Sequence, residues 1–144
     1  MGIDQLIIRQ HHVAFFVGNL ERSVAFYKRC FGFELCITGH VNVANEAVVM
    51  LKGHGMVLEL LSVPGLTTEM IRENCMNTNT HMSFMVSDVA EAKRILSDDP
   101  DVTFEELEIR VVPNIGPMDL RVTFLRGPDG ERLELLQDLN MTEM

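Results

Sequence analysis

One sequence pattern occurs twice in this chain, and a histidine opens each copy while a glutamate closes it. The first copy runs from His12 to Glu59, and the second runs from His81 to Glu134. Both glutamates stand in the same four-residue run, Leu-Glu-Leu-Leu. Two imidazoles and two carboxylates at matched places in two halves form a natural site for a divalent metal. The repeat therefore predicts two similar modules and a metalloenzyme.

Each copy has the same expected order of elements: strand, helix, strand, strand, strand. Alternating β-branched and aromatic residues predict the first strands, and Asn19 and Asp88 are suited to cap the helices that follow. The expected strands of the first copy are 10–17, 34–39, 44–52 and 56–62, and those of the second copy are 80–86, 103–112, 119–126 and 131–136. This order predicts an α+β fold made of two tandem βαβββ modules.

The two copies set the expected domain organisation. Residues 8–63 form the first module, and residues 80–137 form the second. Residues 64–79 between them form a linker, which includes a short helical segment at 68–74. A chain of 144 residues is one domain by length, so we expect the modules to share one domain over residues 1–144.

Strand periodicity places the ionisable residues on one face of each sheet. Side chains two positions apart share a face, so His12 lies with Phe16, and Glu59 lies with Val57 and Leu61. In the second copy, His81 lies with Met85 in the same way. Charged groups among apolar neighbours are costly to desolvate unless they are paired or bind a metal. We expect Phe16, Val57, Leu61 and Met85 to line a substrate pocket beside the ligands.

Composition excludes several other functions. The net charge of −9 argues against nucleic acid and against an anionic membrane surface as partners. No run approaches the roughly 20 apolar residues of a spanning helix, and no signal peptide is readable at the amino terminus. The three cysteines show no close-pair metal spacing, which favours reduced thiols. We therefore expect a cytoplasmic protein that acts on a small molecule.

From about residue 8 to residue 136, the chain resembles the vicinal-oxygen-chelate superfamily of glyoxalases, bleomycin-resistance proteins and extradiol dioxygenases. Its motifs are His12-Val-Ala-Phe-Phe-Val, the run from Asn19 to Tyr27, Gly32-Phe-Glu-Leu, and Gly127-Pro-Asp-Gly-Glu-Arg-Leu-Glu-Leu. The resemblance implies an open, cup-shaped mixed sheet around the metal. It also implies a homodimer, since many members exchange modules between chains, and the apolar face of each module needs a partner.

The same resemblance assigns the metal ligands as His12, Glu59, His81 and Glu134. This set is similar to that of bacterial glyoxalase I, which isomerises the hemithioacetal of methylglyoxal and glutathione. It implies Ni²⁺, Co²⁺, Zn²⁺ or Mn²⁺ and disfavours iron. The metal would act as a Lewis acid, with Glu134 as the base and Glu59 as the partner acid or second base.

Two departures argue against glutathione itself. Glyoxalase I binds the glutamyl carboxylate with an Arg and an Asn, four residues after the first and second ligands. Phe16 and Val63 stand at these positions here, and an apolar pair cannot bind a carboxylate. The pattern thus favours glyoxalase-like lyase or isomerase chemistry with a different thiol.

Other functions stay open at this point. An extradiol dioxygenase would use two His and one Glu for iron, and an acyl-CoA epimerase would usually have Gln at position 59. A non-catalytic drug-binding or resistance protein would use the same cup without the ligands, and fosfomycin-type thiol transfer normally uses three. The segment 113–119 is either a loop over the mouth of the cup or a plain strand connection.

Overall fold

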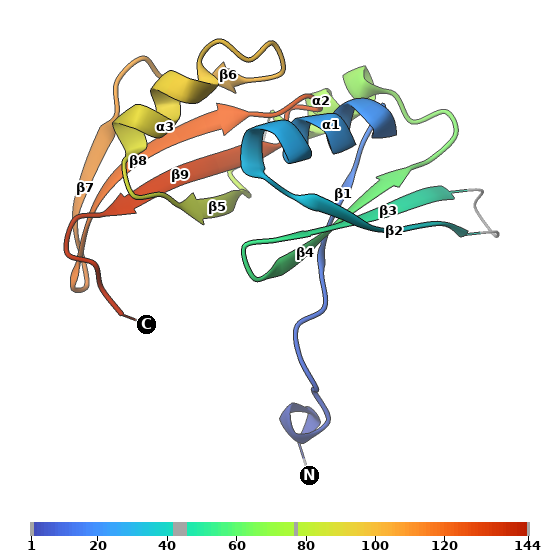
Figure 1. Ribbon diagram of the computed structural model, residues 1–144, viewed down its shortest axis with the longest axis horizontal. Helices are drawn as coiled ribbons and strands as arrows, with labels where there is room; N and C mark the ends of the chain where they lie inside the picture. Colours follow the sequence, from blue (N-terminus) through green and yellow to red (C-terminus); the bar gives the residue numbers. More distant parts are fainter. Residues whose placement is uncertain (1, 42–45, 77, 144) are drawn as a thin grey trace. The chain divides into compact units, whose positions relative to one another are not determined.

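The computed structural model describes residues 2–41, 46–76 and 78–143, and the chain divides into two compact units, Met1–Thr67 and Thr68–Met144. Each unit repeats the same arrangement of elements, which confirms the predicted α+β fold of two βαβββ modules (Figure 1). The predicted linker helix is present as α2 (Thr68–Cys75) and belongs to the second unit, where Arg72 donates two hydrogen bonds to the carbonyl oxygen of Pro128.

The first unit holds one helix on a four-stranded sheet. Its strands are β1 (Val13–Phe16), β2 (Glu34–Val41), β3 (Glu46–Gly53) and β4 (Met56–Ser62), and they lie in the order β1-β4-β3-β2. β1 runs parallel to β4, and the other pairs are antiparallel. A short 3₁₀ helix (Ile3–Gln5) lies in the amino-terminal arm, which extends away from this sheet (Figure 1).

The second unit has the same plan with one more strand. It contains β5 (Met82–Met85), β6 (Thr103–Phe104), β7 (Arg110–Ile115), β8 (Met118–Arg126) and β9 (Arg132–Asp138). The order is β5-β9-β8-β6, with β7 also paired to β8, and β5 runs parallel to β9. Its helix α3 (Val89–Leu96) corresponds to α1 (Leu20–Phe31) of the first unit.

Both helices begin at the predicted caps. The side chain of Asn19 accepts a hydrogen bond from the backbone N–H of Arg22 at 3.0 Å, and Asp88 accepts one from Glu91 at 3.0 Å. Gly32 ends α1 with φ of 69°, a left-handed conformation that favours glycine. The two repeats therefore use the same local signals to turn from strand into helix.

One face of each sheet is the core face. In the first unit, Leu58 and Leu60 of β4 are fully buried, and α1 contacts this strand. In the second unit, Leu133 and Leu135 of β9 occupy the matching positions, and α3 contacts β9. The residues between these leucines, including Glu59 and Glu134, must therefore point to the other face.

Several boundaries differ from the sequence prediction. The predicted strand 103–112 is divided into β6 and β7, because Glu105 turns to two arginines and Lys93 donates to the carbonyl oxygens of Glu106 and Leu107. The predicted strand 44–52 begins at Glu46, while residues 44–45 lie outside the described part of the chain. The linker residue at 77 is likewise outside it.

The segment 113–119 is a strand connection. β7 and β8 pair across it as a hairpin, with the backbone N–H of Asn114 donating to Asp119 at 3.0 Å. Asn114 and Gly116 both have positive φ, as a tight turn requires. Of the two alternatives for this segment, the structure therefore shows the plain connection.

Candidate metal centre

The first pair of predicted ligands lies at the start of β1 and the middle of β4. His12 directly precedes β1, and the parallel register places Ala14 beside Glu59. The Nε2 atom of His12 lies 3.4 Å from Oε2 of Glu59. The side chain of Glu59 is 13% exposed and that of His12 is 32% exposed, so both are within reach of a small ligand.

The second pair repeats this geometry. His81 directly precedes β5, and the register places Ser83 beside Glu134. Nε2 of His81 lies 3.8 Å from Oε1 of Glu134, with side chains that are 35% and 13% exposed. The structure thus brings each predicted histidine to its own glutamate, once in each unit.

A backbone hydrogen bond orients the ring of His81. Its Nδ1 atom lies 2.8 Å from the carbonyl oxygen of Asn79. A carbonyl only accepts, so Nδ1 donates this hydrogen bond, and Nε2 is the ring nitrogen that faces Glu134. This backbone contact is the kind that orients metal-binding histidines. In the first unit, the Nδ1 atoms of His11 and His12 lie 2.8 Å apart. The ring of His11 therefore contacts His12 where the carbonyl group of Asn79 contacts His81.

The donor set fits a divalent cation. Imidazole and carboxylate together suit the first-row divalent metals. Within the described residues, no three His, Cys, Asp or Glu side chains converge on one point, and the predicted ligands occur as two His–Glu pairs. Each unit therefore holds half of the predicted ligand set.

The carboxylates differ in their neighbours. The hydroxyl of Ser83 donates to Oε1 of Glu134 at 2.6 Å, a charge-assisted hydrogen bond of short length. The matching neighbour of Glu59 is Ala14, which has no hydroxyl group. The carboxylate of Glu134 is therefore held in one orientation by a side chain that the first unit lacks.

The predicted pocket residues lie on the same sheet faces as the predicted metal ligands. Phe16 pairs with Leu61 in the β1–β4 register, two residues beyond Glu59. Phe16 is 49% exposed and Met85 is 60% exposed, while Val57 and Leu61 are half-buried. Phe16, Val57 and Leu61 thus lie on the face of the first His–Glu pair, and Met85 lies on the face of the second.

Sequence analysis missed a charged cluster near the second pair. Glu105 lies 2.9 Å from Nε of Arg126 and 2.8 Å from Nε of Arg132, and the guanidinium of Arg132 stacks on Phe124. The ring of Phe124 in turn contacts His81 edge-on, with 5.2 Å between centroids. The hydrogen bond from Arg132 lowers the pKa of Glu105, although partial burial opposes that change. Only the strand register brings these residues together.

The family-model comparison identifies the fold family. Residues 9–135 match the Glyoxalase/Bleomycin resistance protein/Dioxygenase superfamily, so the chain belongs to this superfamily. A protein of Bacillus subtilis, YwbC, is 27% identical over 131 residues, which are 90% of this chain and 97% of that protein. The predicted family resemblance is therefore confirmed.

Solved structures agree with this assignment. A glyoxalase family protein from Enterococcus faecalis matches with a TM-score of 0.71 and 26% identity, over 91% of this chain and 98% of that one. The trypanothione-dependent glyoxalase I of Leishmania major matches with a TM-score of 0.64 and 26% identity, over 90% and 86%. The fosfomycin resistance protein FosX of Listeria monocytogenes, solved with Mn(II), shares the fold at 16% identity and a TM-score of 0.62, over 91% and 93%.

Among residues 2–41, 46–76 and 78–143, no helix is long and apolar enough to cross a bilayer.

Proposed function

We propose that this protein is a metal-dependent lyase or isomerase of the glyoxalase type. Its substrate would carry two adjacent oxygens, as the hemithioacetal of an α-ketoaldehyde does. The observation that carries this proposal is the repeated His–Glu pair, with 3.4 Å and 3.8 Å between the partners in the two units. Superfamily membership and a 26%-identical glyoxalase I support it.

The four ligands would act as one centre. His12, Glu59, His81 and Glu134 would hold Ni²⁺, Co²⁺, Zn²⁺ or Mn²⁺, either within one chain or across a homodimer. When bound, the cation supplies a Lewis acid that stabilises the enediolate developing on the substrate. FosX, which shares the fold, is bound to Mn(II) in its solved structure, which is consistent with a divalent ion.

The protein residues would divide the remaining work. Glu134 would take the proton from the carbon beside the carbonyl group, and Glu59, as the partner acid, would give a proton of its own to the neighbouring carbon; exchange with solvent would then reset both carboxyl groups. Ser83 would orient Glu134 through its 2.6 Å hydrogen bond. Phe16, Val57, Leu61 and Met85 would exclude water from the reacting atoms, which strengthens every electrostatic contact there.

The thiol partner would be other than glutathione. Phe16 lies half-exposed on the ligand face of β1, where glyoxalase I would need a cationic side chain for the glutamyl carboxylate. The solved glyoxalase I of Leishmania major is described as trypanothione-dependent, so a different thiol has a precedent among proteins of this fold.

The test combines metal analysis with activity. The protein is purified without added metal, its metal content is measured, and the metal is removed with a chelator and added back. Turnover of methylglyoxal is then followed with a panel of thiols. We expect stoichiometric metal and activity that returns with Ni²⁺, Co²⁺, Zn²⁺ or Mn²⁺. Iron with oxygen uptake on a catechol would indicate a dioxygenase instead, and a metal-free protein that binds hydrophobic molecules would overturn the proposal.

A further inference from the structure

The two units differ at one corner of the ligand face, which is the sheet face that carries the histidine and the glutamate. This corner lies two residues along the strands from the glutamate. In both units the middle strands pair in the same register around the glutamate: Met50 faces Glu59, and Phe124 faces Glu134. Two residues further along these strands, Lys52 faces Val57 in the first unit, and Arg126 faces Arg132 in the second. Lys52 is thus the counterpart of Arg126, on the same sheet face as the metal ligands.

In the second unit, a carboxylate of the protein itself fills this corner. Glu105 follows directly after β6 and bridges Arg126 and Arg132 at 2.9 Å and 2.8 Å. Its side chain is 21% exposed, so the group is well packed. This corner therefore holds a carboxylate between two cationic side chains, one of which, Arg132, is two residues from Glu134.

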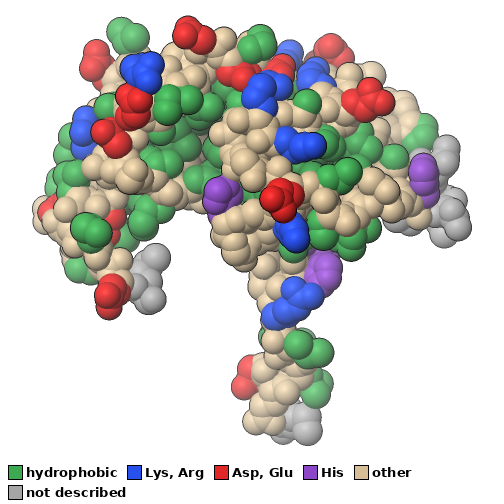
Figure 2. Space-filling model, in the orientation of Figure 1, with side chains coloured by type: hydrophobic (Ala, Val, Ile, Leu, Met, Phe, Trp, Pro, Cys, Tyr) green, Lys and Arg blue, Asp and Glu red, His purple; other side chains and the backbone are tan. Residues whose placement is uncertain are grey.

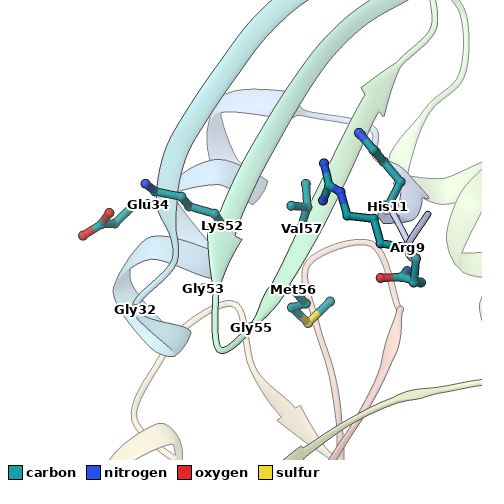
Figure 3. Close-up of a pocket in the computed structure, with 10 residues that line it drawn as sticks. Arg9, His11, Gly32, Glu34, Lys52, Gly53, Gly55, Met56 and Val57 are labelled. Atoms are coloured by element: carbon teal, nitrogen blue, oxygen red, sulfur yellow. The ribbon is translucent and has the colours of Figure 1, made fainter.

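In the first unit, the same corner is open. Cys36 and Ile37 occupy the place that Glu105 has in the second unit. Val57 occupies the place of Arg132. A pocket of about 470 Å³ lies here, and its charged or titratable lining residues are Arg9, His11, Glu34 and Lys52. Figure 3 shows Lys52 and Glu34 on one side of the pocket, Arg9 and His11 on the other, and Val57 between them.

The charge in this pocket contrasts with that of the whole chain. Arg9 and Lys52 give two positive charges against one negative charge from Glu34, a balance of +1 while His11 is neutral. The chain as a whole carries −9. A hollow with a net positive charge on an acidic protein attracts a small anion.

We propose that this pocket binds a carboxylate of the substrate, in the place that Glu105 takes in the second unit. This inference rests on the proposed function, because Lys52 lies about 6.6 Å along β3 from the residue that faces Glu59. The substrate would then be a chelating molecule with a carboxylate several bonds from its two adjacent oxygens. Lys52, the counterpart of Arg126, would donate to the carboxylate, Arg9 on the other side of Val57 would add positive charge, and Glu34 beside Lys52 would weaken the binding (Figure 3).

Binding is measured on metal-free protein, which separates this test from that of the proposed function. Glutarate, its neutral analogue glutaramide and inorganic phosphate are titrated, and the backbone amide resonances of Gly53, Gly55 and Val57 are followed by NMR. We expect glutarate to shift these resonances and glutaramide to leave them in place. Affinity should fall with added salt, because the pocket is open to solvent. Tighter binding of phosphate would assign the pocket to a phosphorylated substrate in place of a carboxylate.

Three variants complete the test. Lys52→Met should weaken glutarate binding about tenfold, the size expected when one charge-assisted hydrogen bond is lost. Glu34→Gln should strengthen it, because one repulsive charge is removed. Lys28→Met removes the same charge from α1 and should leave the affinity unchanged. Equal binding of glutarate and glutaramide, or wild-type affinity in Lys52→Met, would overturn the proposal.

Discussion

The two units hold the same His–Glu pair in different surroundings. In the second unit, Glu134 is fixed by the hydroxyl of Ser83, and the corner beyond it is closed by the ion pairs of Glu105. In the first unit, Ala14 stands beside Glu59, and the same corner is a pocket with Lys52 in its wall. The repeat has kept the side chains that would hold a metal, while the side chains around them have diverged. The second unit thus orients the carboxylate of Glu134, while the first unit has an open pocket beyond Glu59.

The largest expected effect separates the two glutamates. Glu134→Gln should lower turnover by about a thousandfold, since a general base contributes 10²- to 10⁴-fold. Glu59→Gln should lower it less if Glu59 serves as the partner acid. Steady-state kinetics on protein loaded with one defined metal measures both, with metal content as the control. Equal activity of Glu134→Gln and the wild type would show that Glu134 is not the base.

The second prediction concerns the closed corner. Glu105→Gln should destabilise the second unit by about 3 kcal/mol, because it leaves two largely buried guanidinium groups without their carboxylate. Glu106→Gln is the matched control, since Glu106 pairs with Arg110 in a more exposed place, where ion pairs contribute about 0–1 kcal/mol. Hydrogen exchange read separately in the two units distinguishes the variants. Similar exchange in both would mean that the buried bridge adds nothing to stability.

The third prediction tests the orientation of Glu134. Ser83→Ala should lower kcat about tenfold at nearly constant KM, because a hydrogen bond to a charged group is removed. Ser83→Thr keeps the hydroxyl group and should restore most of the rate. The electronic spectrum of the Co²⁺-loaded protein should change in Ser83→Ala and return in Ser83→Thr. An unchanged spectrum in both variants would show that Ser83 does not orient Glu134.

The smallest effect is a pH dependence of stability. The pKa of Glu105 lies below its ordinary value of 4.5, owing first to the hydrogen bond from Arg132. A lowered pKa in the folded state gives stability that is complete above the unfolded value and is lost as the pH falls through the folded one. Acid should therefore loosen the second unit below about pH 4.5. In Glu105→Gln this part of the acid sensitivity should vanish, as a comparison of unfolding curves at several pH values would show.

Much of the fold could be predicted because the chain shows both the alternation of strand residues and the repeat of one strand–helix pattern. The alternation around Glu59 and Glu134 predicted which face is buried, and Leu58 and Leu133 confirm it with no exposed surface. The cluster around Glu105 could not be predicted in this way. It depends on the register of β8 with β6 and β9, and a local pattern does not specify which distant residues a strand will face.

The open pocket could not be predicted from the sequence either, because its lining residues come from distant parts of the chain. Arg9 lies in the amino-terminal arm, and Lys52 lies at the end of β3. Figure 2 shows hydrophobic side chains at the tip of this arm, where Ile3, Leu6 and Ile7 are exposed. Nothing in the local sequence of the arm indicates that its last residues border the β3–β4 turn.

The parallel pairing of β1 with β4 also has a consequence for folding. This pairing joins the first strand of the module to its last, so His12 meets Glu59 only where two strands separated by a helix and a hairpin come together. We expect contacts between such distant residues to form late, because closing a long loop costs entropy before the contact is gained. A metal held by this pair would thus bind the completed module and not its precursors. Its concentration would then shift the unfolding equilibrium by mass action, and a chelator would speed proteolysis even where no substrate is turned over.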